Sequence, residues 1–585
     1  MKKYLISSKR VLLDVFHITP ASTILVVLYM LFVAMIPATL TILYEKLFSS
    51  ISNINNNYLN TTILIGLLIC LVYFIRYIFQ SAYAVAMNAR IYEKVSFSSK
   101  VTISEKASDL NLIDYENPSR MNLKGIATDC VNQSKISQFF MNIVGISTGL
   151  IGLTSTTIVL SRYSIYFLPI VIISVLPYLV SRIIRGKAFY CIREAQIPKL
   201  RMQNYIWSLL LDKQSVKEIK VMCSHKYIGD MWTNPRNEIN DEIWSHRKKD
   251  SFVLLLCDLF RIFSYALSIF FALILLKKSV IGIGVFGACI SAFLSMQQQF
   301  KDLLVGIGEA TEQIQFINKY YEFLDLQVLP DGNVVKSDIN HGINVSNVSF
   351  AYPNTGDVLK NISISIEKGE KIAIVGENGS GKTTLAKIIL GLYQPKDGSV
   401  QYDDIDINKL SKDSKYNLLC SVSQDFVKYC LTYRENIAIS DTASMDNTEK
   451  ILNTIAAVGN KGVLEKINID DLLGTEFGGM DLSGGEWQKT AIGRAVFKES
   501  QLIVFDEPTS ALDPIVESDI LTLLLNVMSN VTSILISHRT GVCRFVDKIA
   551  VLSKGELVEY GSHQELLHLE GYYYKLFTEQ QQWYK

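Results

Sequence analysis

The sequence is poor in charged residues and has no paired cysteines. Charged side chains make up only 19% of its 585 residues, and the formal net charge is +1. A chain with so little net charge creates no field that would attract nucleic acid, so we expect no nucleic-acid partner. The nine cysteines are scattered singly, and none lies in a C-x-x-C pair. This pattern argues against a disulfide framework or a cysteine metal site and is typical of a reducing compartment.

A cleavage site of small residues after the first apolar segment is also missing, which argues against a cleaved signal peptide. What the first half of the chain has instead is a series of long runs almost free of charge. About 20 apolar residues cross the hydrocarbon of a bilayer, so each run is long enough to span it. A soluble core would need several successive helices that are apolar all round, which is unusual. We therefore predict six membrane spans, carried by segments 15–44, 47–75, 136–161, 163–181, 251–276 and 279–300.

Basic residues alternate between the connections of these spans. Lys and Arg number four before the first span and then one, seven, one, fourteen and two in the successive connections. Because basic residues accumulate on the cytoplasmic side, this alternation places both termini and the long connections in the cytoplasm.

A few polar residues interrupt the apolar segments. Asp258 and Arg261 lie three positions apart near the start of the fifth span and can pair on one helical face. Arg76 is the one full charge well inside a span, where it faces a watery cavity or snorkels to the inner interface. The sixth span contains three consecutive glutamines, Gln297, Gln298 and Gln299, and one face of that helix must accommodate these polar side chains.

The second half of the chain contains a phosphate-binding loop. Residues 376–383 fit the pattern G-x-x-x-x-G-K-[ST] at every specified position, between an apolar β-prone run and a helix-forming run. Glycines let successive backbone N–H groups turn inward, and the following helix adds its positive end. Lys382 is placed to reach the β- and γ-phosphates, and the Thr383 hydroxyl to bind Mg²⁺. The residues expected to hold ATP here are Gly376, Asn378, Gly379, Ser380, Gly381, Lys382, Thr383 and Thr384.

Two further apolar runs end in residues suited to ATP hydrolysis. One ends at Asp506 and Glu507, so Asp506 is expected to hold Mg²⁺ beside the phosphate loop and Glu507 to act as the general base. The other ends at His538, which is either a structural histidine or a γ-phosphate contact. Upstream, Tyr352 offers a ring that could stack on adenine.

Ser483, Gly484 and Gly485 precede a helix-forming run, and Ser483 and Glu486 have the S-x-x-E spacing of a capping box. The same group, together with the helix dipole, can form a second anion site. One nucleotide needs only one such phosphate-binding site. The second site therefore has no nucleotide to bind in a monomer, unless it binds the nucleotide of another copy of the chain.

At this point the motif set resembles the nucleotide-binding domain of the ABC transporter family. The phosphate loop, Gln424, the Ser483 segment, Asp506 with Glu507, the segment ending at Asp513, and His538 occur in that family's order. The resemblance implies that Gln424 and Asp513 contact the nucleotide site and that Gln424 senses Mg²⁺ and the membrane domain. It also implies a homodimer in which each ATP lies between one copy's phosphate loop and the other's Ser483.

The resulting architecture is an α-helical six-span transmembrane domain followed by an α/β P-loop nucleotide-binding domain, an exporter-type half-transporter in a bacterial-type cytoplasmic (plasma) membrane. We expect a transmembrane domain over residues 1–320, a linker over 321–342 and the nucleotide-binding domain over 343–585. The patch Asp114–Pro118 and the segment Lys217–Lys220 lie in the long inner connections. Each segment either contacts the nucleotide-binding domain or is solvated, the first as a turn and the second as a helix face.

A narrower resemblance points to the nisin-type lantibiotic exporters. It is carried by Gln424–Tyr429, Arg434–Ile437 and Gly391–Pro395. It implies export of a ribosomally made modified peptide with its leader attached, with peptide-modifying enzymes as further partners. The alternative within transport is a lipid or multidrug exporter, although Thr475–Asp481 departs from the multidrug pattern. An ATP-binding regulatory protein would lack Glu507 or His538, and both are present.

Overall fold

The computed structural model describes the chain except residue 1 and the segments 53–58, 86–89, 164–168, 170–172, 174–195, 197–198, 329, 354, 509–513, 530 and 584–585. It consists of two compact units. The first comprises Met1–Ser108 and Asn122–Leu326, and the second comprises Asp109–Met121 and Gln327–Lys585.

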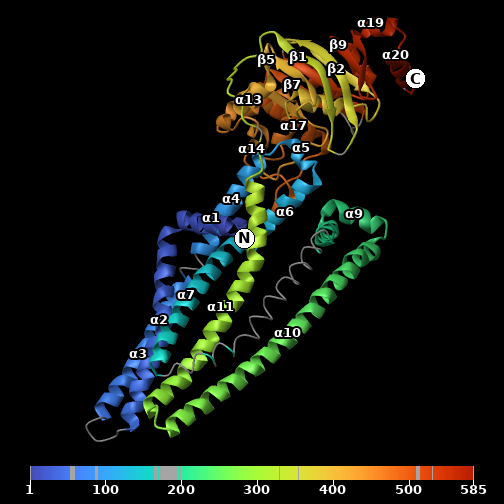
Figure 1. Cartoon of the computed structure of the whole chain (residues 1–585). Coiled ribbons are helices and arrows are strands. Elements are labelled where there is room, and N and C mark those ends of the chain that lie inside the picture. The colour runs from blue at the N-terminus through green and yellow to red at the C-terminus, as the bar shows by residue number, and fades with distance from the viewer. Residues whose placement is uncertain are drawn as a thin grey trace. The chain divides into compact units, whose positions relative to one another are not determined.

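The first unit is built of long helices, among which α2, α7 and α11 pack against one another (Figure 1). Among the described residues before 327, the helices with assigned bounds include α1 (Lys2–Ile18), α2 (Pro20–Ser52), α3 (Leu59–Val85), α4 (Glu93–Asp109), α5 (Leu112–Tyr115), α6 (Pro118–Asn132), α7 (Lys135–Tyr163), α9 (Lys213–Val221), α10 (His225–Lys277) and α11 (Ile283–Leu324).

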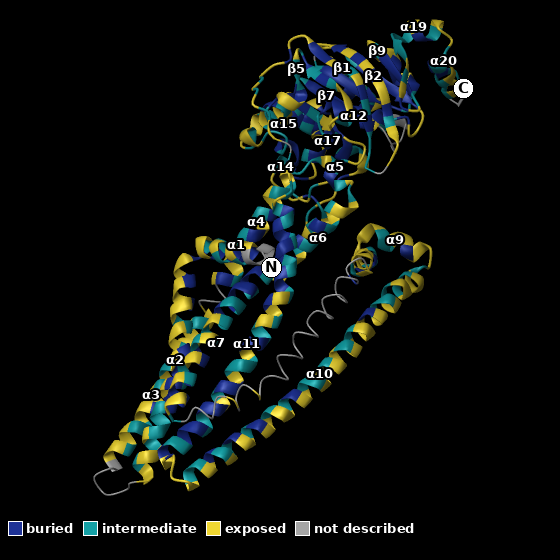
Figure 2. Ribbon diagram, viewed as in Figure 1, coloured by how far each residue is buried: buried dark blue, intermediate teal, exposed yellow. Residues whose placement is uncertain are grey.

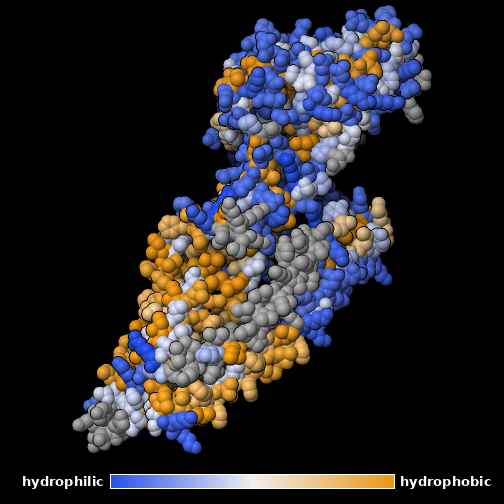
Figure 3. Space-filling model, viewed as in Figure 1, coloured by the Kyte–Doolittle hydropathy of each residue, from blue (hydrophilic) through white to orange (hydrophobic). Residues whose placement is uncertain are grey.

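Four helices in the described part of the chain are long and apolar enough to cross a membrane. Three of them are α2, α7 and α10, and the fourth begins within α3. Large apolar side chains such as Leu67 and Phe74 of α3 are exposed, and Figure 2 shows exposed residues along these helices. On the face seen in Figure 3, hydrophobic residues cover much of this unit. The predicted fourth span, residues 163–181, lies almost entirely outside the described residues. The sixth forms α11 but is not one of the four, because Gln297–Gln299 lower its mean hydropathy.

The polar residues in these helices have distinct surroundings. The predicted pairing of Asp258 with Arg261 is confirmed at 3.4 Å, and Lys301 also contacts Asp258. Gln297 is buried, and its Nε2 lies 3.4 Å from the Arg261 carbonyl oxygen. Arg76 is exposed on α3 within this unit. A cavity position for Arg76 therefore stays a prediction.

The second unit contains two sheets. A four-stranded sheet has the order β2-β1-β4-β5 with antiparallel neighbours, and a six-stranded sheet has the order β10-β9-β3-β8-β7-β6. In the larger sheet only β10 is antiparallel to its neighbour. The strands are β1 (Gly342–Ala351), β2 (Asp357–Glu367), β3 (Lys371–Gly376), β4 (Asp397–Tyr402), β5 (Ile405–Asp406), β6 (Leu419–Val422), β7 (Leu502–Asp506), β8 (Thr532–Ile536), β9 (Lys548–Ser553) and β10 (Glu556–Gly561).

Helices cover both faces of the larger sheet, whose parallel strands are apolar on both sides as such sheets require. In β3, Ile372 and Ile374 join one core cluster while Ala373 and Val375 join the other. The helices are α12 (Lys382–Ile389), α13 (Lys412–Leu418), α14 (Tyr433–Ala438), α15 (Thr448–Ala457), α16 (Lys461–Leu464), α17 (Gly484–Lys498), α18 (Pro514–Met528), α19 (His563–His568), α20 (Tyr572–Trp583), and the 3₁₀ helices η2 (Ile407–Lys409), η3 (Thr442–Ser444), η4 (Thr475–Phe477) and η5 (Thr540–Phe545).

Residues Asp109–Met121, from the first long inner connection, belong to this second unit. Helix α5 ends at Tyr115 and α6 begins at Pro118, so the patch does interrupt the helix as predicted. Ile113 packs against the core, and the Tyr393 hydroxyl donates to Oε1 of Glu116 at 3.3 Å. The alternative of a solvated turn is therefore wrong for Asp114–Pro118. The segment Lys217–Lys220 forms part of α9, in the first unit.

Candidate active site

The loop between β3 and α12 follows a path that only glycine permits at two positions. Gly376 has a φ of +152° and Gly381, the residue before α12, has a φ of +101°. A Cβ at Gly376 would lie 2.1 Å from the carbonyl oxygen of Leu552, and one at Gly381 would lie 2.5 Å from Cδ2 of Leu359. Both positions require glycine for conformation and for space. The loop therefore has the tight course of a phosphate-binding loop ahead of a helix amino terminus.

Two side chains of this loop are buried polar groups that suit an anion. Nζ of Lys382 donates to the carbonyl oxygens of Gly376 at 3.0 Å and Glu377 at 2.9 Å. Burial lowers the pKa of Lys382, while the carboxylates of Glu507 and Asp506 act in the opposite direction. Oγ of Ser380 is buried and has no hydrogen-bond partner among the described residues. A phosphate oxygen would give Ser380 the partner that it lacks and would give the Lys382 ammonium an anionic partner. Asn378 and Gly379 are exposed at the tip of the loop.

Asp506 lies at the carboxyl end of β7, next to the start of α12. The hydroxyl of Thr383 donates to its Oδ1 at 3.3 Å. Burial raises the pKa of Asp506, the hydrogen bond from Thr383 lowers it, and the adjacent Glu507 raises it further. A hydroxyl and a carboxylate side by side are the oxygen ligands that Mg²⁺ prefers, and a divalent cation would compensate the buried charge. The residues therefore fit this metal.

Glu507 follows Asp506 and leaves the strand through a left-handed backbone conformation, with φ of +47°. Its backbone N–H donates to the carbonyl oxygen of Ile536 in β8 at 3.0 Å. Such a conformation is uncommon for a residue other than glycine and is found where a site demands it. His538, just beyond β8, reaches across so that its Nε2 contacts Oε1 of Glu507. The structure thus brings together the two residues predicted to be catalytic.

Tyr352 and Thr384 lie at the edge of this group. Their hydroxyl oxygens are 3.0 Å apart. The Tyr352 ring contacts Phe350 and Tyr393 edge-on, with centroids 5.1 and 5.7 Å away. The ring is partly exposed, and its stacking on adenine stays a prediction.

Gln424 is exposed shortly after β6, which pairs in parallel with β7. Because the carboxyl ends of neighbouring parallel strands meet at one edge of a sheet, Gln424 and Asp506 both lie at that edge. Asp513 lies outside the described residues.

Ser483 begins α17 with the predicted capping box. Its side chain accepts from the backbone N–H of Glu486, and Glu486 accepts from the Ser483 backbone N–H at 2.8 Å. Ser483 and Gly484 are exposed and Gly485 is partly buried, and Lys466 holds Glu486 at 2.7 Å. Among the described residues, the hydrogen bonds of Ser483 go to Glu486 and Trp487, and none goes to Lys382, Asp506, Glu507 or His538.

A pocket of about 190 Å³ adjoins the phosphate loop and His538. Gly376, Glu377, Asn378 and His538 line it, and α20 contributes Leu576 and Gln580. No sequence motif identifies these two residues of α20 as part of a site. Gln580 begins a run of three glutamines, and no spacing rule connects such a run to a strand end forty residues earlier.

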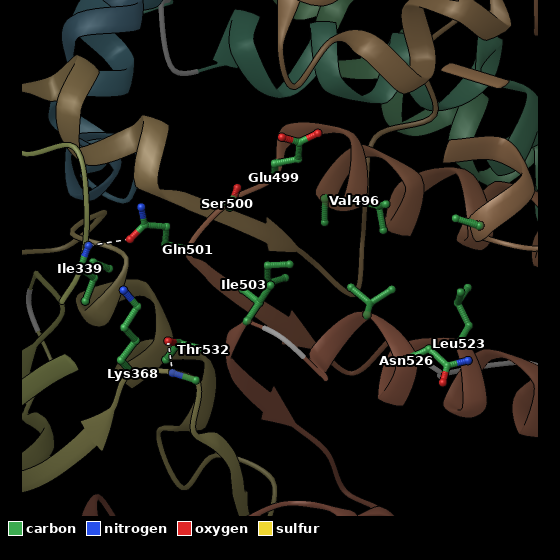
Figure 4. A pocket seen from close by; sticks show the side chains of 15 residues that line it. Ile339, Lys368, Val496, Glu499, Ser500, Gln501, Ile503, Leu523, Asn526 and Thr532 are labelled. Atoms are coloured by element: carbon green, nitrogen blue, oxygen red, sulfur yellow. Dashed lines mark hydrogen bonds between the residues drawn. The ribbon is translucent and has the colours of Figure 1, made fainter. Parts of the chain in front are cut away.

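A larger pocket of about 670 Å³ lies elsewhere, at the amino ends of β7 and β8 (Figure 4). Ile503, Leu523 and Val496 form apolar parts of its wall, and Lys368 and Asn526 contribute polar side chains. The parallel strands carry Asp506 and His538 at their opposite ends. The larger pocket is therefore separate from the candidate active site, and none of the predicted site residues lines it.

Comparison with known proteins agrees with this geometry. Residues 359–510 match the sequence family described as ABC transporter. Over 562 residues the chain is 30% identical to the nisin transport ATP-binding protein of Lactococcus lactis subsp. lactis, covering 94% of this chain and 92% of that protein. It is also 30% identical over 491 residues to the subtilin transport ATP-binding protein of Bacillus subtilis, covering 82% of this chain and 79% of that one.

Among solved structures, the chain resembles a bacterial Atm1-family ABC exporter with ATP bound. The TM-score is 0.83 and the sequence identity is 19%, and the match covers 95% of this chain and 98% of the other. At this identity the likeness shows an exporter fold and no more than that.

Proposed function

This chain belongs to the ABC transporter family, and we propose that it is a homodimeric peptide exporter. It is a multi-pass membrane protein whose ATPase domain couples ATP hydrolysis to transport. One observation carries the ATPase part of this proposal. Lys382, Thr383, Asp506, Glu507 and His538 come from three separate segments, and the fold gathers them at one edge of the six-stranded sheet.

The roles of these residues follow from their positions. Lys382 exchanges its two carbonyl partners for the β- and γ-phosphates of ATP, and the loop amides with Ser380 hold the same phosphates. Glu507 accepts a proton from the water that attacks the γ-phosphorus, and the bond to the β-phosphate oxygen breaks to release ADP and phosphate. His538 holds the Glu507 carboxylate and contacts the γ-phosphate. Tyr352 stacks on the adenine ring.

Thr383 and Asp506 would hold Mg²⁺, with Gln424 close to it. When bound, this ion neutralises charge that develops on the phosphate oxygens during transfer. The chain's own contribution is to orient the Asp506 carboxylate through the hydrogen bond from the Thr383 hydroxyl.

The dimer is proposed because Ser483 is exposed on the surface of its unit, where its described hydrogen bonds stay within the start of α17. In a face-to-face pair, Ser483, Gly484 and Gly485 of one copy would close over the ATP bound by the other, with Asp513 at the same junction. An exposed helix amino terminus with a serine cap is chemically suited to a phosphate that arrives with a partner. Each ATP site is then complete only in the pair.

The membrane part of the proposal has six spans per copy, both termini in the cytoplasm and a bacterial-type plasma membrane. It rests on the four helices that are apolar and long enough, together with the alternation of basic residues. We divide the chain into a transmembrane domain, 1–320, a linker, 321–342, and a nucleotide-binding domain, 343–585. ATP binding closes the pair, the long helices transmit this closure, and hydrolysis resets the inward-facing state.

The proposed cargo is a ribosomally made modified peptide that carries its leader, with the modifying enzymes as further partners. It is supported by the two relatives whose names concern nisin and subtilin transport and that align along most of this chain. Export of a lipid or of small drugs is the alternative. Both alternatives share the ATPase site and differ only in what the membrane domain accepts.

Reconstitution of the purified chain into proteoliposomes tests this choice. ATPase activity would be measured with modified leader-bearing peptides, with the same peptides lacking their leaders, with lipids and with hydrophobic cations. We expect stimulation by the leader-bearing peptide and ATP-dependent accumulation of that peptide in inside-out vesicles. Stimulation by lipid or by hydrophobic cations alone would overturn the peptide assignment and leave the ATPase assignment standing.

A further inference from the structure

Gln580 of α20 binds the segment that carries His538 through three hydrogen bonds. Its Nε2 donates to the His538 carbonyl oxygen. Its Oε1 accepts from the backbone N–H of Thr540 at 2.8 Å and from the Thr540 hydroxyl at 2.9 Å. Thr540 is 3% exposed, so these groups have little access to water. One side-chain amide thus holds both His538, in the connection between β8 and η5, and Thr540, the first residue of η5.

The helix that supplies Gln580 is itself firmly anchored. Tyr573 and Phe577 are buried in the core cluster that also contains Leu535 of β8. The Tyr573 hydroxyl lies 2.8 Å from Nδ1 of His563, and the Tyr573 backbone N–H donates to Glu559 at 2.9 Å. Gln580 lies about two turns further along the same helix, so its amide is presented from a rigid support.

The same helix also touches the phosphate loop. Burial and the nearby Glu377 side chain raise the pKa of Tyr572, and the carbonyl oxygen of Glu377 accepts from Lys382. Leu576 and Gln580 line the pocket between Gly376 and His538. Helix α20 therefore contacts both segments of the candidate active site, although no residue of α20 is among the predicted catalytic groups.

The carbonyl group that Gln580 holds and the ring that contacts Glu507 belong to one residue, His538. If the amide donor is removed, the carbonyl oxygen must find another partner, and the peptide rotates to do so. The imidazole moves with it, away from the Glu507 carboxylate. Since a displacement of about 1 Å at a reacting group can lower a rate about a hundredfold, a small rotation would be visible in turnover.

We propose that Gln580 is a positioning residue for ATP hydrolysis, which acts by fixing the main chain of His538 and thereby the contact of His538 with Glu507. The helix α20 is then a brace that sets the geometry of the hydrolytic step while leaving nucleotide affinity unaffected. This inference rests on the proposed ATPase function.

The first test replaces Gln580 by leucine in the full-length chain reconstituted in lipid nanodiscs. Leucine keeps the approximate size and removes all three hydrogen bonds. We expect kcat to fall by roughly tenfold, within the range a misplaced catalytic group produces, while KM for ATP stays within about twofold. The matched control is Gln581→Leu, at an exposed position on the same helix, which should retain wild-type kcat. Equal kcat for Gln580→Leu and Gln581→Leu would overturn the proposal.

A second variant guards against misfolding. Gln580→Glu keeps an acceptor for Thr540 and loses the donor to His538, so it preserves the fold but is expected to lower kcat as Gln580→Leu does. Wild-type kcat in Gln580→Glu would show that the contact with His538 is irrelevant and would refute the inference.

A double-mutant cycle separates positioning from general stabilisation. If Gln580 acts only through His538, adding Gln580→Leu to a His538→Ala chain should lower the residual turnover no further. A loss of the same factor in both backgrounds contradicts the positioning role. If the wild type does not hydrolyse ATP, or if His538→Ala and Glu507→Gln turn over like the wild type, it is the proposed function that fails.

Discussion

The hydroxyl of Thr383 donates a hydrogen bond of 3.3 Å to Oδ1 of Asp506, a residue 123 positions later in the chain. The first residue belongs to the start of α12 and the second to the end of β7, and β8 separates β7 from β3 in the sheet. The contact exists because the parallel strands β3, β8 and β7 all end at one edge. It places a pair of candidate metal ligands directly beside the phosphate loop.

Replacing Glu507 by glutamine should abolish turnover while leaving ATP bound. The amide keeps the size of the side chain but cannot take a proton from water, and loss of a general base typically costs about 10²–10⁴ in rate. Phosphate release and binding of radiolabelled ATP would be measured side by side. Glu556→Gln is the control, because Glu556 is an exposed residue of β10 that forms a surface ion pair with Lys360 at 3.5 Å. Wild-type turnover in Glu507→Gln would remove Glu507 from the role of base.

Replacing Lys382 by alanine should weaken ATP binding. Its Nζ is the only side-chain cation that the fold aims at the carbonyl oxygens of Gly376 and Glu377 in the described part of the loop. Loss of a charge-assisted contact worth about 1.5–3 kcal/mol corresponds to roughly one to two orders of magnitude in affinity. Equilibrium binding of a fluorescent ATP analogue measures it.

The control for this change is Lys396→Ala, which removes an exposed lysine paired with Asp357 at 3.1 Å. A surface pair of this kind contributes little, so affinity and stability should both be retained. If Lys382→Ala binds ATP as well as the Lys396 variant does, the phosphate-contact assignment is wrong.

The sequence predicted what local patterns and strand direction control. The loop motif names Lys382 and Thr383 because each position has a mechanical role, and the apolar runs before Asp506 and His538 identify the strands that carry them. The capping box at Ser483 is confirmed because it depends only on residues three apart. The pairing of Asp258 with Arg261 is confirmed for the same reason.

What the sequence could not predict depends on distant packing. The three hydrogen bonds of Gln580 join elements about forty residues apart, and nothing in a run of glutamines specifies which one turns inward. The left-handed conformation of Glu507 follows from its amide reaching β8. The burial of Gln297 against α10 likewise depends on how two long helices meet, which hydropathy does not encode.

Replacing Asp403 by asparagine should destabilise the nucleotide-binding unit in a pH-dependent way. Its carboxylate is held by three backbone N–H groups and one ammonium group, those of Asn340, His341, Gly342 and Lys336. Burial raises the pKa of Asp403, but these hydrogen bonds outweigh it and hold the pKa well below the usual range.

The sign of the pH dependence follows from that lowered pKa. A carboxylate whose pKa is lower in the folded state stabilises the fold fully above its unfolded pKa of about 4, and the contribution disappears as pH falls through the folded value. We expect Asp403→Asn to cost about 2 kcal/mol from pH 8 to pH 5, with the difference shrinking only below about pH 4. Thermal unfolding at several pH values measures it, with the exposed neighbour Asp404→Asn as control. A constant difference down to pH 3 would contradict the assignment.

Replacing Ser483 by alanine tests whether the ATP site is shared between two copies. The change removes a helix cap, which by itself costs about 1 kcal/mol, so a matched variant with the same structural loss is needed. Ser562→Ala supplies it, because Ser562 caps α19 through an identical capping box with Glu565. Both variants should be destabilised alike, and only Ser483→Ala should lose ATP hydrolysis.

Mixing two inactive chains then distinguishes a shared site from a site within one copy. If Ser483 acts on the ATP of the partner, a dimer of one Lys382→Ala chain and one Ser483→Ala chain contains one complete site, formed by the intact loop of the second and the intact serine of the first. Separately tagged copies, purified through both tags, should therefore regain hydrolysis that neither variant shows alone. If Ser483 served its own chain, both copies of the mixed dimer would remain defective. If variants that each still dimerise form a mixed dimer without activity, Ser483 does not act on the ATP of the partner copy, and the proposed dimer is contradicted.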